Sequence, residues 1–215
     1  MNRLYPIFLK LEGRLCVVVG GGKVAERKAR GLLECGAAVR VISPEVELNL
    51  RELEAEGRIE WVRREFQAGD LEGVSLAVAA TDREPVNAQV YEEAREAGVL
   101  CNVVDQPERC DFYVPAVAQQ GDLKIAVSGN GRSGGLVAGI RRMLQEQFGQ
   151  EYGRVLAEAG RLRDAVRRRY PEDPARRAEV LARLVRVDEV LDALRNGDRR
   201  KIDAVLESWK SFLSD

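Results

Sequence analysis

A continuous apolar run followed at once by three glycines constrains this chain more than any other feature. Leu15-Cys16-Val17-Val18-Val19 is typical of a strand that is covered on both faces. The next residues, Gly20-Gly21-Gly22-Lys23-Val24-Ala25, fit the pattern Gly-x-Gly-x-x-Ala, and helical sequence continues to Cys35. A strand, a glycine turn and a helix in this order predict the first unit of a dinucleotide-binding fold.

The turn carries the residues that phosphate binding requires. Gly20 permits the tight turn, Gly22 lets the backbone approach a pyrophosphate, and Ala25 allows the helix to pack closely on the strand. The free N–H groups and partial positive charge of the helix N-terminus then face the phosphates. The alternative is a glycine-rich turn that binds nothing. We predict that the residues of this turn that bind the cofactor are Gly20, Gly21, Gly22, Lys23 and Val24.

Strands and helices alternate through the first half of the chain. Apolar strands are expected at 39–42, 59–62, 76–80 and 99–104, and helices at 24–35, 48–56 and 85–97. This rhythm predicts an α/β fold with a parallel doubly wound sheet. It breaks after Asp105, where a turn-rich stretch precedes a strand at 123–127 and a helix at 133–148. From residue 151 the chain is charged and helical, and Pro171 and Pro174 divide it into at least two helices.

The end of the second strand bears on the choice between NAD and NADP. An acidic residue about 20 positions beyond the glycines holds the ribose hydroxyls in many such folds. Here Ser43, Pro44 and Glu45 follow the strand, and no arginine comes directly after it to hold a 2′-phosphate. We therefore predict that these three residues contact the cofactor and that NAD is preferred. The alternative is that Glu45 is a solvated residue at the start of the next helix.

Composition excludes several classes of function. The 215 residues include no histidine, which rules out an imidazole base, a Ser-His pair and a His-bound zinc, and we predict no metal site. The net charge of −1 points to neither nucleic acid nor an anionic membrane, and no apolar run is long enough to span one. The N-terminus lacks the features of a signal peptide, and the four cysteines are scattered. We expect structural thiols and a cytoplasmic protein.

Three stretches carry a resemblance to a known family: LCVVVGGGKVAERKAR at 15–30, AATD at 79–82 and CNVVD at 101–105. Together they resemble the precorrin-2 dehydrogenase/sirohydrochlorin ferrochelatase family, whose module also forms the N-terminal part of siroheme synthase. The opening Tyr5-Pro6-Ile7-Phe8-Leu9 is similar to that family as well. The resemblance covers residues 4–145, and its separate motifs occur in the family's order.

The resemblance implies a reaction and an architecture. Members of this family oxidise precorrin-2 to sirohydrochlorin with NAD, and some then insert ferrous iron; the residues leave open whether this chain does so. Members of the family are dimers, so the resemblance also implies a homodimer. The substrate that it implies is a tetrapyrrole. We expect a Rossmann domain over 1–111, a dimerisation segment over 112–148 and a helical domain over 149–215.

Asp105 is the position that matches the family's essential aspartate. It follows a buried strand at the carboxyl end, where ligands bind in open α/β sheets, and a chain without histidine offers few other bases. We predict that its carboxylate takes the proton lost when the ring is oxidised. On the residues alone, a structural turn aspartate is an equal alternative.

The resemblance extends to residues around the cofactor. Ala80, Thr81 and Asp82 would pass under the cofactor, and Asn102 and Val104 would flank the nicotinamide. Asp82 has an equal alternative, which is to cap the helix that starts near residue 85.

A polar loop before the helix at 133–148 is the candidate for substrate binding. Ser128, Asn130 and Arg132 belong to it, and such a turn is rich in N–H donors that suit a substrate carboxylate. Gly129 and Gly134 depart from the family's pattern, which has a hydroxyl residue and a proline there. This departure weakens the transfer of the loop's role.

Two other classes of protein compete with this interpretation. One is a nucleotide-sensing regulatory Rossmann protein without catalysis, which would need an output module that the chain lacks. The other is a structural protein with an idle Rossmann fold, against which Asp105 argues. Titration with the cofactor tests the structural class, because an idle Rossmann fold would not bind it.

Overall fold

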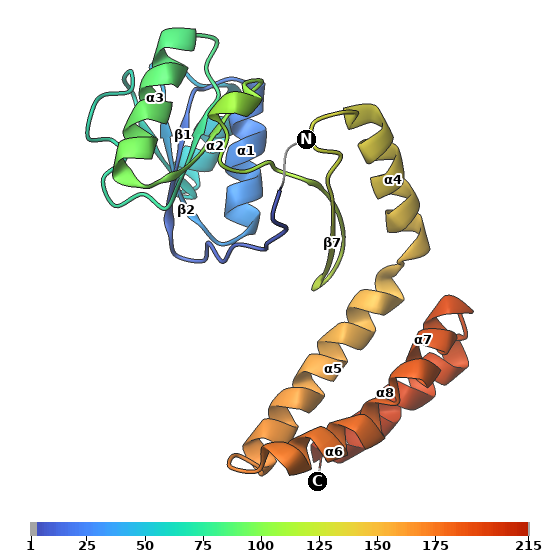
Figure 1. Cartoon of the computed structure of the whole chain (residues 1–215). Coiled ribbons are helices and arrows are strands. Elements are labelled where there is room, and N and C mark those ends of the chain that lie inside the picture. Colours follow the sequence, from blue (N-terminus) through green and yellow to red (C-terminus); the bar gives the residue numbers. More distant parts are fainter. Residues whose placement is uncertain (1–3, 215) are drawn as a thin grey trace. The chain divides into compact units, whose positions relative to one another are not determined.

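The structure is a computed structural model that describes residues 4–214. It divides into two compact units, the first ending at Val114 and the second beginning at Pro115 (Figure 1). The predicted segments 112–148 and 149–215 thus fall almost entirely within one unit.

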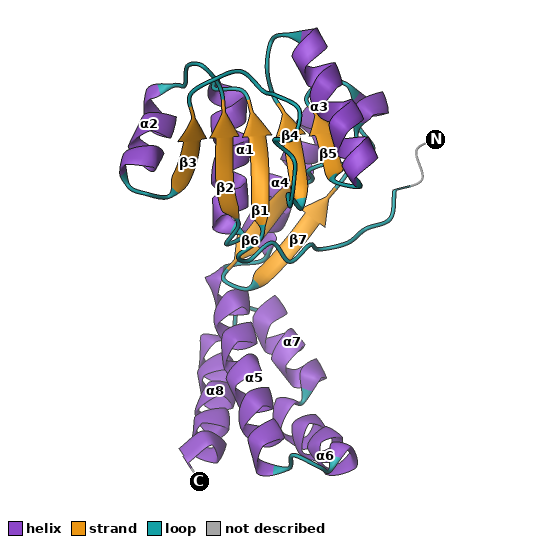
Figure 2. Cartoon of the chain, turned by 90° about the vertical axis from the view of Figure 1, so that its left-hand side faces the viewer, coloured by secondary structure: helices purple, strands orange, loops and turns teal. Residues whose placement is uncertain are grey.

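The first unit is built on a parallel sheet of five strands. These are β1 (Leu15–Val19), β2 (Ala38–Ile42), β3 (Ile59–Val62), β4 (Leu76–Ala79) and β5 (Leu100–Val103), in the spatial order β3-β2-β1-β4-β5. Figure 2 shows their arrows pointing the same way, so all five carboxyl ends meet at one edge. The predicted α/β class and parallel sheet are confirmed.

Helices cover both faces of this sheet because its central strand is apolar on both sides. Cys16 and Val18 belong to the core on one face, with residues of α1 (Lys23–Glu34) and α2 (Leu48–Ala55). Val17 and Val19 belong to the core on the other face, with residues of α3 (Glu84–Ala97). Figure 2 shows α1 behind the sheet and α3 in front of it. This is the two-faced burial that a continuous apolar strand predicts.

The chain does not continue the sheet after β5. It makes a turn and a short 3₁₀ helix, η1 (Pro107–Arg109), and returns to pair with its own strand through an antiparallel bridge between Asn102 and Cys110. Val104 and Phe112 pack on the core that contains α1. The predicted break in rhythm is therefore a segment folded back over the α1 face.

The second unit starts with a ribbon that the sequence revealed only in part. β7 (Leu123–Val127) was expected, whereas its antiparallel partner β6 (Ala116–Gln120) was not. The helix α4 (Gly134–Gln147) completes the edge of the ribbon: the Gln145 side chain accepts from the Gln119 N–H and donates to its carbonyl, each at 3.0 Å. This amide therefore replaces a neighbouring strand at that point.

From residue 150 the described chain forms four helices, α5 (Gln150–Arg169), α6 (Pro174–Val185), α7 (Val187–Arg195) and α8 (Arg199–Ser214). Pro174 occupies the first turn of α6, where its missing N–H costs nothing. Leu162 and Trp209 are completely buried in their common core, and the Trp209 indole donates to the Leu184 carbonyl at 2.9 Å. No helix within residues 4–214 is long and apolar enough to cross a membrane.

The cysteines are all free thiols. Cys16 and Cys101 are completely buried in the sheet, and burial raises the pKa of Cys16 to about 11 and that of Cys101 to about 12. Both are therefore protonated packing residues. Cys35 is exposed and Cys110 is half-buried.

Candidate cofactor and active site

The glycine turn between β1 and α1 is shaped by close contacts with two other loops. Gly20 has φ +123°, and a Cβ there would lie 2.4 Å from the Ala80 carbonyl oxygen. A Cβ at Gly21 would lie 1.9 Å from the Glu45 carbonyl oxygen. A Cβ at Gly22, in contrast, would meet no atom within 4 Å. The first two glycines are needed by the protein's own backbone, and the third faces open space.

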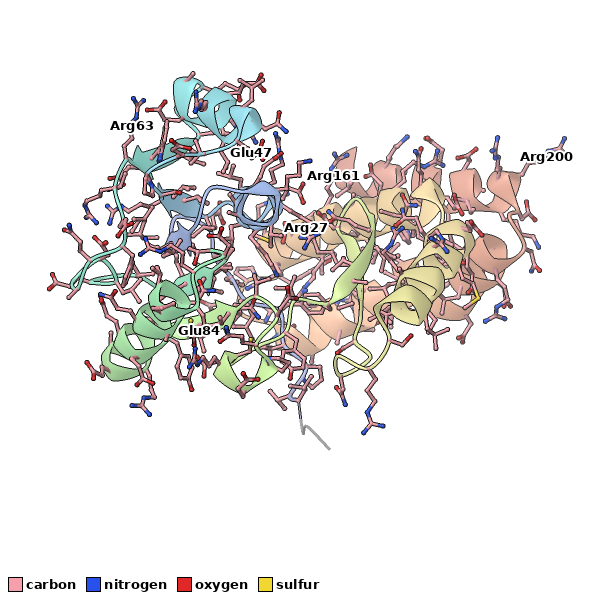
Figure 3. All side chains as sticks on the ribbon, turned by 90° about the horizontal axis from the view of Figure 1, so that it is seen from above. Arg27, Glu47, Arg63, Glu84, Arg161 and Arg200 are labelled. Carbon is pink, nitrogen blue, oxygen red and sulfur yellow. The ribbon has the colours of Figure 1, made fainter. Side chains whose placement is uncertain are left out.

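That open space lies at the N-terminus of α1. Gly22 is the N-cap of α1, and no side-chain hydrogen bond caps the helix there. The first N–H groups of α1 are therefore available to an anion, and the helix dipole adds partial positive charge. Lys23 is exposed and Val24 half-buried in the same first turn. Figure 3 views this edge from above and shows α1 nearly end-on. A pyrophosphate fits these donors.

The turn after β2 uses one of the predicted residues for its own structure. Ser43 is buried, and its hydroxyl donates to the Glu45 carbonyl at 2.6 Å, so the hydroxyl is occupied within the turn. Pro44 and Glu45 are exposed. The Glu45 carboxylate makes no hydrogen bond or ion pair with a described residue, so it is available to a ribose.

Sequence reasoning missed an arginine beside this turn. The Ser43 N–H donates to the Val62 carbonyl, so Arg63, which follows β3, lies next to the end of β2. Its guanidinium stacks 4.4 Å from the centre of the Trp61 ring. The pairing of β2 with β3 places Arg63 next to the end of β2, where its guanidinium also pairs with the Glu54 carboxylate of α2 at 3.4 Å.

The loop after β4 is fixed by a buried amide that the sequence did not single out. The Thr81 hydroxyl donates to the Asn87 Oδ1 at 2.7 Å, and the Asn87 amide donates to the Thr81 carbonyl at 3.1 Å. Asn87 is only 4% exposed. The N-cap of α3 is Arg83, so the alternative that Asp82 caps this helix is wrong. Asp82 is exposed and Ala80 half-buried beside Gly20.

Asp105 projects from a turn that the surrounding residues hold in place. Its φ is +61°, a left-handed conformation that aspartate and asparagine tolerate better than other side chains. The Cys110 sulfur lies 3.2 Å from the carbonyl oxygen of Val103, before the turn, and 3.2 Å from that of Gln106, after it. The thiol therefore links the two sides of the turn. Burial raises the pKa of this thiol, so it stays protonated and donates. The Asp105 carboxylate is exposed and makes no hydrogen bond with a described residue.

Asn102 anchors the segment that follows. Its amide donates to the Phe112 carbonyl at 2.9 Å and to the Cys110 sulfur at 3.3 Å. Both N–H donors of the Asn102 side chain are thus used within the protein. Only its amide oxygen, Oδ1, is left to make the predicted contact with the nicotinamide. Val104 is half-buried and bonded to the end of β4, its N–H donating to the Ala79 carbonyl at 2.9 Å.

The predicted substrate loop belongs to the second unit, between β7 and α4. Asn130 has φ +52° and Gly131 φ +76°, which turns the chain sharply. The Asn130 N–H donates to the Ser128 hydroxyl at 3.3 Å. Ser128, Asn130 and Arg132 are all exposed. Within residues 4–214, no group of three or more histidine, cysteine or carboxylate side chains is arranged to hold a metal ion.

Known proteins resemble the chain over most of its length. It is 41% identical to siroheme synthase 3 of Aeromonas hydrophila over 94% of its own residues and 43% of the relative's. It is 38% identical to the siroheme synthase of Chromobacterium violaceum, with the same coverage. The chain thus spans less than half the length of these relatives. The solved structure of SirC, a precorrin-2 dehydrogenase, matches 97% of this chain and 100% of its own, with 27% identity and a TM-score of 0.76.

Sheet order, glycine turn and strand-end residues define a dinucleotide-binding Rossmann protein. Residues 7–116 match the family described as "Putative NAD(P)-binding", and residues 151–208 match the "Sirohaem synthase dimerisation region". The chain belongs to the family of precorrin-2 dehydrogenases and siroheme synthase N-terminal modules, as its motifs predicted.

Proposed function

We propose that this protein oxidises precorrin-2 to sirohydrochlorin with NAD. One observation carries the proposal: the open cradle at Gly22 and the free carboxylate of Asp105 both follow strands whose carboxyl ends form one edge of the sheet. The match to a precorrin-2 dehydrogenase over nearly the whole chain supports the substrate. The siroheme synthases support the pathway, although they are longer proteins.

The roles of the residues follow from their positions. NAD, when bound, accepts the hydride. The N–H groups at the start of α1 hold the pyrophosphate, and the exposed Glu45 carboxylate accepts the ribose hydroxyls. Asp105 takes the proton that leaves the tetrapyrrole, since no histidine is present. Ser128, Asn130 and Arg132 receive substrate carboxylates. Ferrous iron insertion would use Asp105 again, as the acceptor of protons from the ring nitrogens.

Anaerobic incubation with precorrin-2 tests the proposal. We expect NADH to form with NAD and more slowly with NADP, because Glu45 repels a 2′-phosphate. A faster reaction with NADP would mean that Arg63 governs the ribose site. Ferrous iron, added after NADH formation ends, shows whether siroheme follows. Tight NAD binding without any NADH would instead favour a nucleotide-sensing protein. We place the reaction in the cytoplasm, where the four free thiols stay reduced.

We also propose a homodimer that pairs through the segment 112–148, with the Rossmann domain over 1–111 and the helical domain over 149–215. Leu136 and Met143 of α4 support this segment, since they are 66% and 57% exposed. The match of residues 151–208 to a dimerisation region supports a dimer and offers a competing interface.

Light scattering should give twice the chain mass of 23.9 kDa. Leu136→Glu should reduce this to the monomer mass, because a carboxylate would be buried in the interface. Leu156→Glu tests the competing interface on α5, where the leucine is 44% exposed. If Leu156→Glu is a monomer and Leu136→Glu remains a dimer, the interface lies in the helical domain.

A further inference from the structure

Lys28 occupies an unusual position on α1. It lies one helical turn after Ala25 and one turn before Leu32, both of which are buried against the sheet. Lys28 is therefore on the flank of the packed side of α1 and is half-buried. Arg27, one residue earlier, is exposed and points away from the sheet (Figure 3). A lysine at such a position gives up much of its hydration.

The segment that carries Asp105 lies on the same flank. Val104 and Phe112 pack on the core to which Ala25 and Leu32 belong. The negative charge of Asp105, on this segment, opposes the lowering of the Lys28 pKa. Lys28 nevertheless makes no ion pair or hydrogen bond with any residue in the described chain. The Lys28 ammonium and the Asp105 carboxylate thus belong to elements that pack on one core, and they form no ion pair with each other.

This arrangement leaves a charge without a direct counter-ion. Burial, followed by the nearby Arg27 charge, lowers the pKa of Lys28. Burial also raises the pKa of Cys110, so its thiol is neutral and does not balance the ammonium. A partly desolvated cation is costly unless something pairs with it. An anionic group from a ligand, seated between Lys28 and the turn of Asp105, would supply that partner.

We propose that Lys28 binds a carboxylate of the substrate and so positions the adjoining ring beside Asp105. This inference rests on the proposed function, in which the substrate is a polycarboxylate tetrapyrrole. The cofactor's pyrophosphate is the less suitable anion, because it is served by the first turn of α1 and Lys28 lies more than one turn further along. Lys28 acts on substrate affinity, and Asp105 on the chemical step.

Steady-state kinetics test this role through three variants. Lys28→Met should raise KM for precorrin-2 by about 10- to 100-fold, the range of a hydrogen bond to a charged group, with little change in kcat. Lys28→Arg should restore most of the affinity, because it keeps the charge. Arg27→Met, which removes one positive charge from the exposed side of the same helix, should leave KM near the wild-type value. NAD affinity should be unchanged in all three.

The pH dependence of KM gives a readout that a merely structural lysine would not produce. The titratable groups that act on the pKa of Lys28 are Arg27 on its own helix, and Cys110 and Asp105 on the segment after β5. Since the pKa of Lys28 is lowered, its charge is complete at low pH and is lost as pH rises, earlier than for an ordinary lysine. KM should therefore rise with pH in the wild type. It should stay flat over the same range in Lys28→Arg, which keeps Cys110 and Asp105.

Binding of the product separates this inference from the proposed function. Sirohydrochlorin, titrated by fluorescence without NAD, should bind the wild type and Lys28→Arg and bind Lys28→Met at least tenfold more weakly. The role of Lys28 would be overturned if Lys28→Met and Arg27→Met both formed NADH at the wild-type rate and had the same KM for precorrin-2. A loss in kcat alone would overturn it too. Selective sirohydrochlorin binding without NADH formation by the wild type would keep Lys28 as a carboxylate site and reject the dehydrogenase.

Discussion

Replacing Asp105 with asparagine should slow NADH formation from precorrin-2 by about 10²- to 10⁴-fold, the usual contribution of a general base. Asparagine keeps the shape of the side chain but does not accept a proton at neutral pH. It also tolerates the φ of +61° at this position, so the turn held by Cys110 should persist. NAD affinity, measured by calorimetry, should therefore match the wild type.

Glu108→Gln is the matched control for this variant. Glu108 lies in η1 on the same segment and is exposed, so its loss changes the local charge equally without removing the base. It should keep wild-type NADH formation. Wild-type NADH formation in Asp105→Asn would instead mean that another group, or solvent, takes the proton. If the protein also inserts iron, both activities should fall together in Asp105→Asn. Loss of chelation alone would assign Asp105 to the metal step.

Replacing Gly22 with valine should abolish NAD binding and leave the fold intact. The new side chain would project into space that contains no protein atom within 4 Å, so nothing in the protein has to move. That same space adjoins the free N–H groups of α1, where the pyrophosphate must approach the backbone. Calorimetric titration with NAD measures the loss, and circular dichroism checks the fold.

Variants of two other glycines, Gly21 and Gly31, serve as comparisons for Gly22→Val. Gly21→Ala should lower the melting temperature, because its Cβ would collide with the Glu45 carbonyl, and overpacking of this kind costs about 1–3 kcal/mol. Gly31→Ala, in α1 with open space around it, should leave both stability and NAD affinity at least at wild-type level. Unchanged NAD affinity in Gly22→Val would remove the pyrophosphate from this turn.

Local signals in the sequence were enough to predict the Rossmann unit. An apolar run such as 15–19 is a strand buried on both faces, and a glycine turn before a helix leaves N–H groups free. The position of Asp105 after β5 followed from the same pattern. β6 was missed because the apolar and polar residues of Ala116–Gln120 alternate only weakly, and the strand is defined by its pairing with β7.

Residues of the site that are far apart in the sequence come together only through strand pairing and chain reversal. Arg63 reaches the end of β2 because β3 pairs with that strand. The segment that carries Asp105 comes close to α1, the helix of Lys28, because after β5 it returns over the α1 face. Hydrophobic periodicity reports which side of an element is buried, but strand order and chain reversal determine what that side meets.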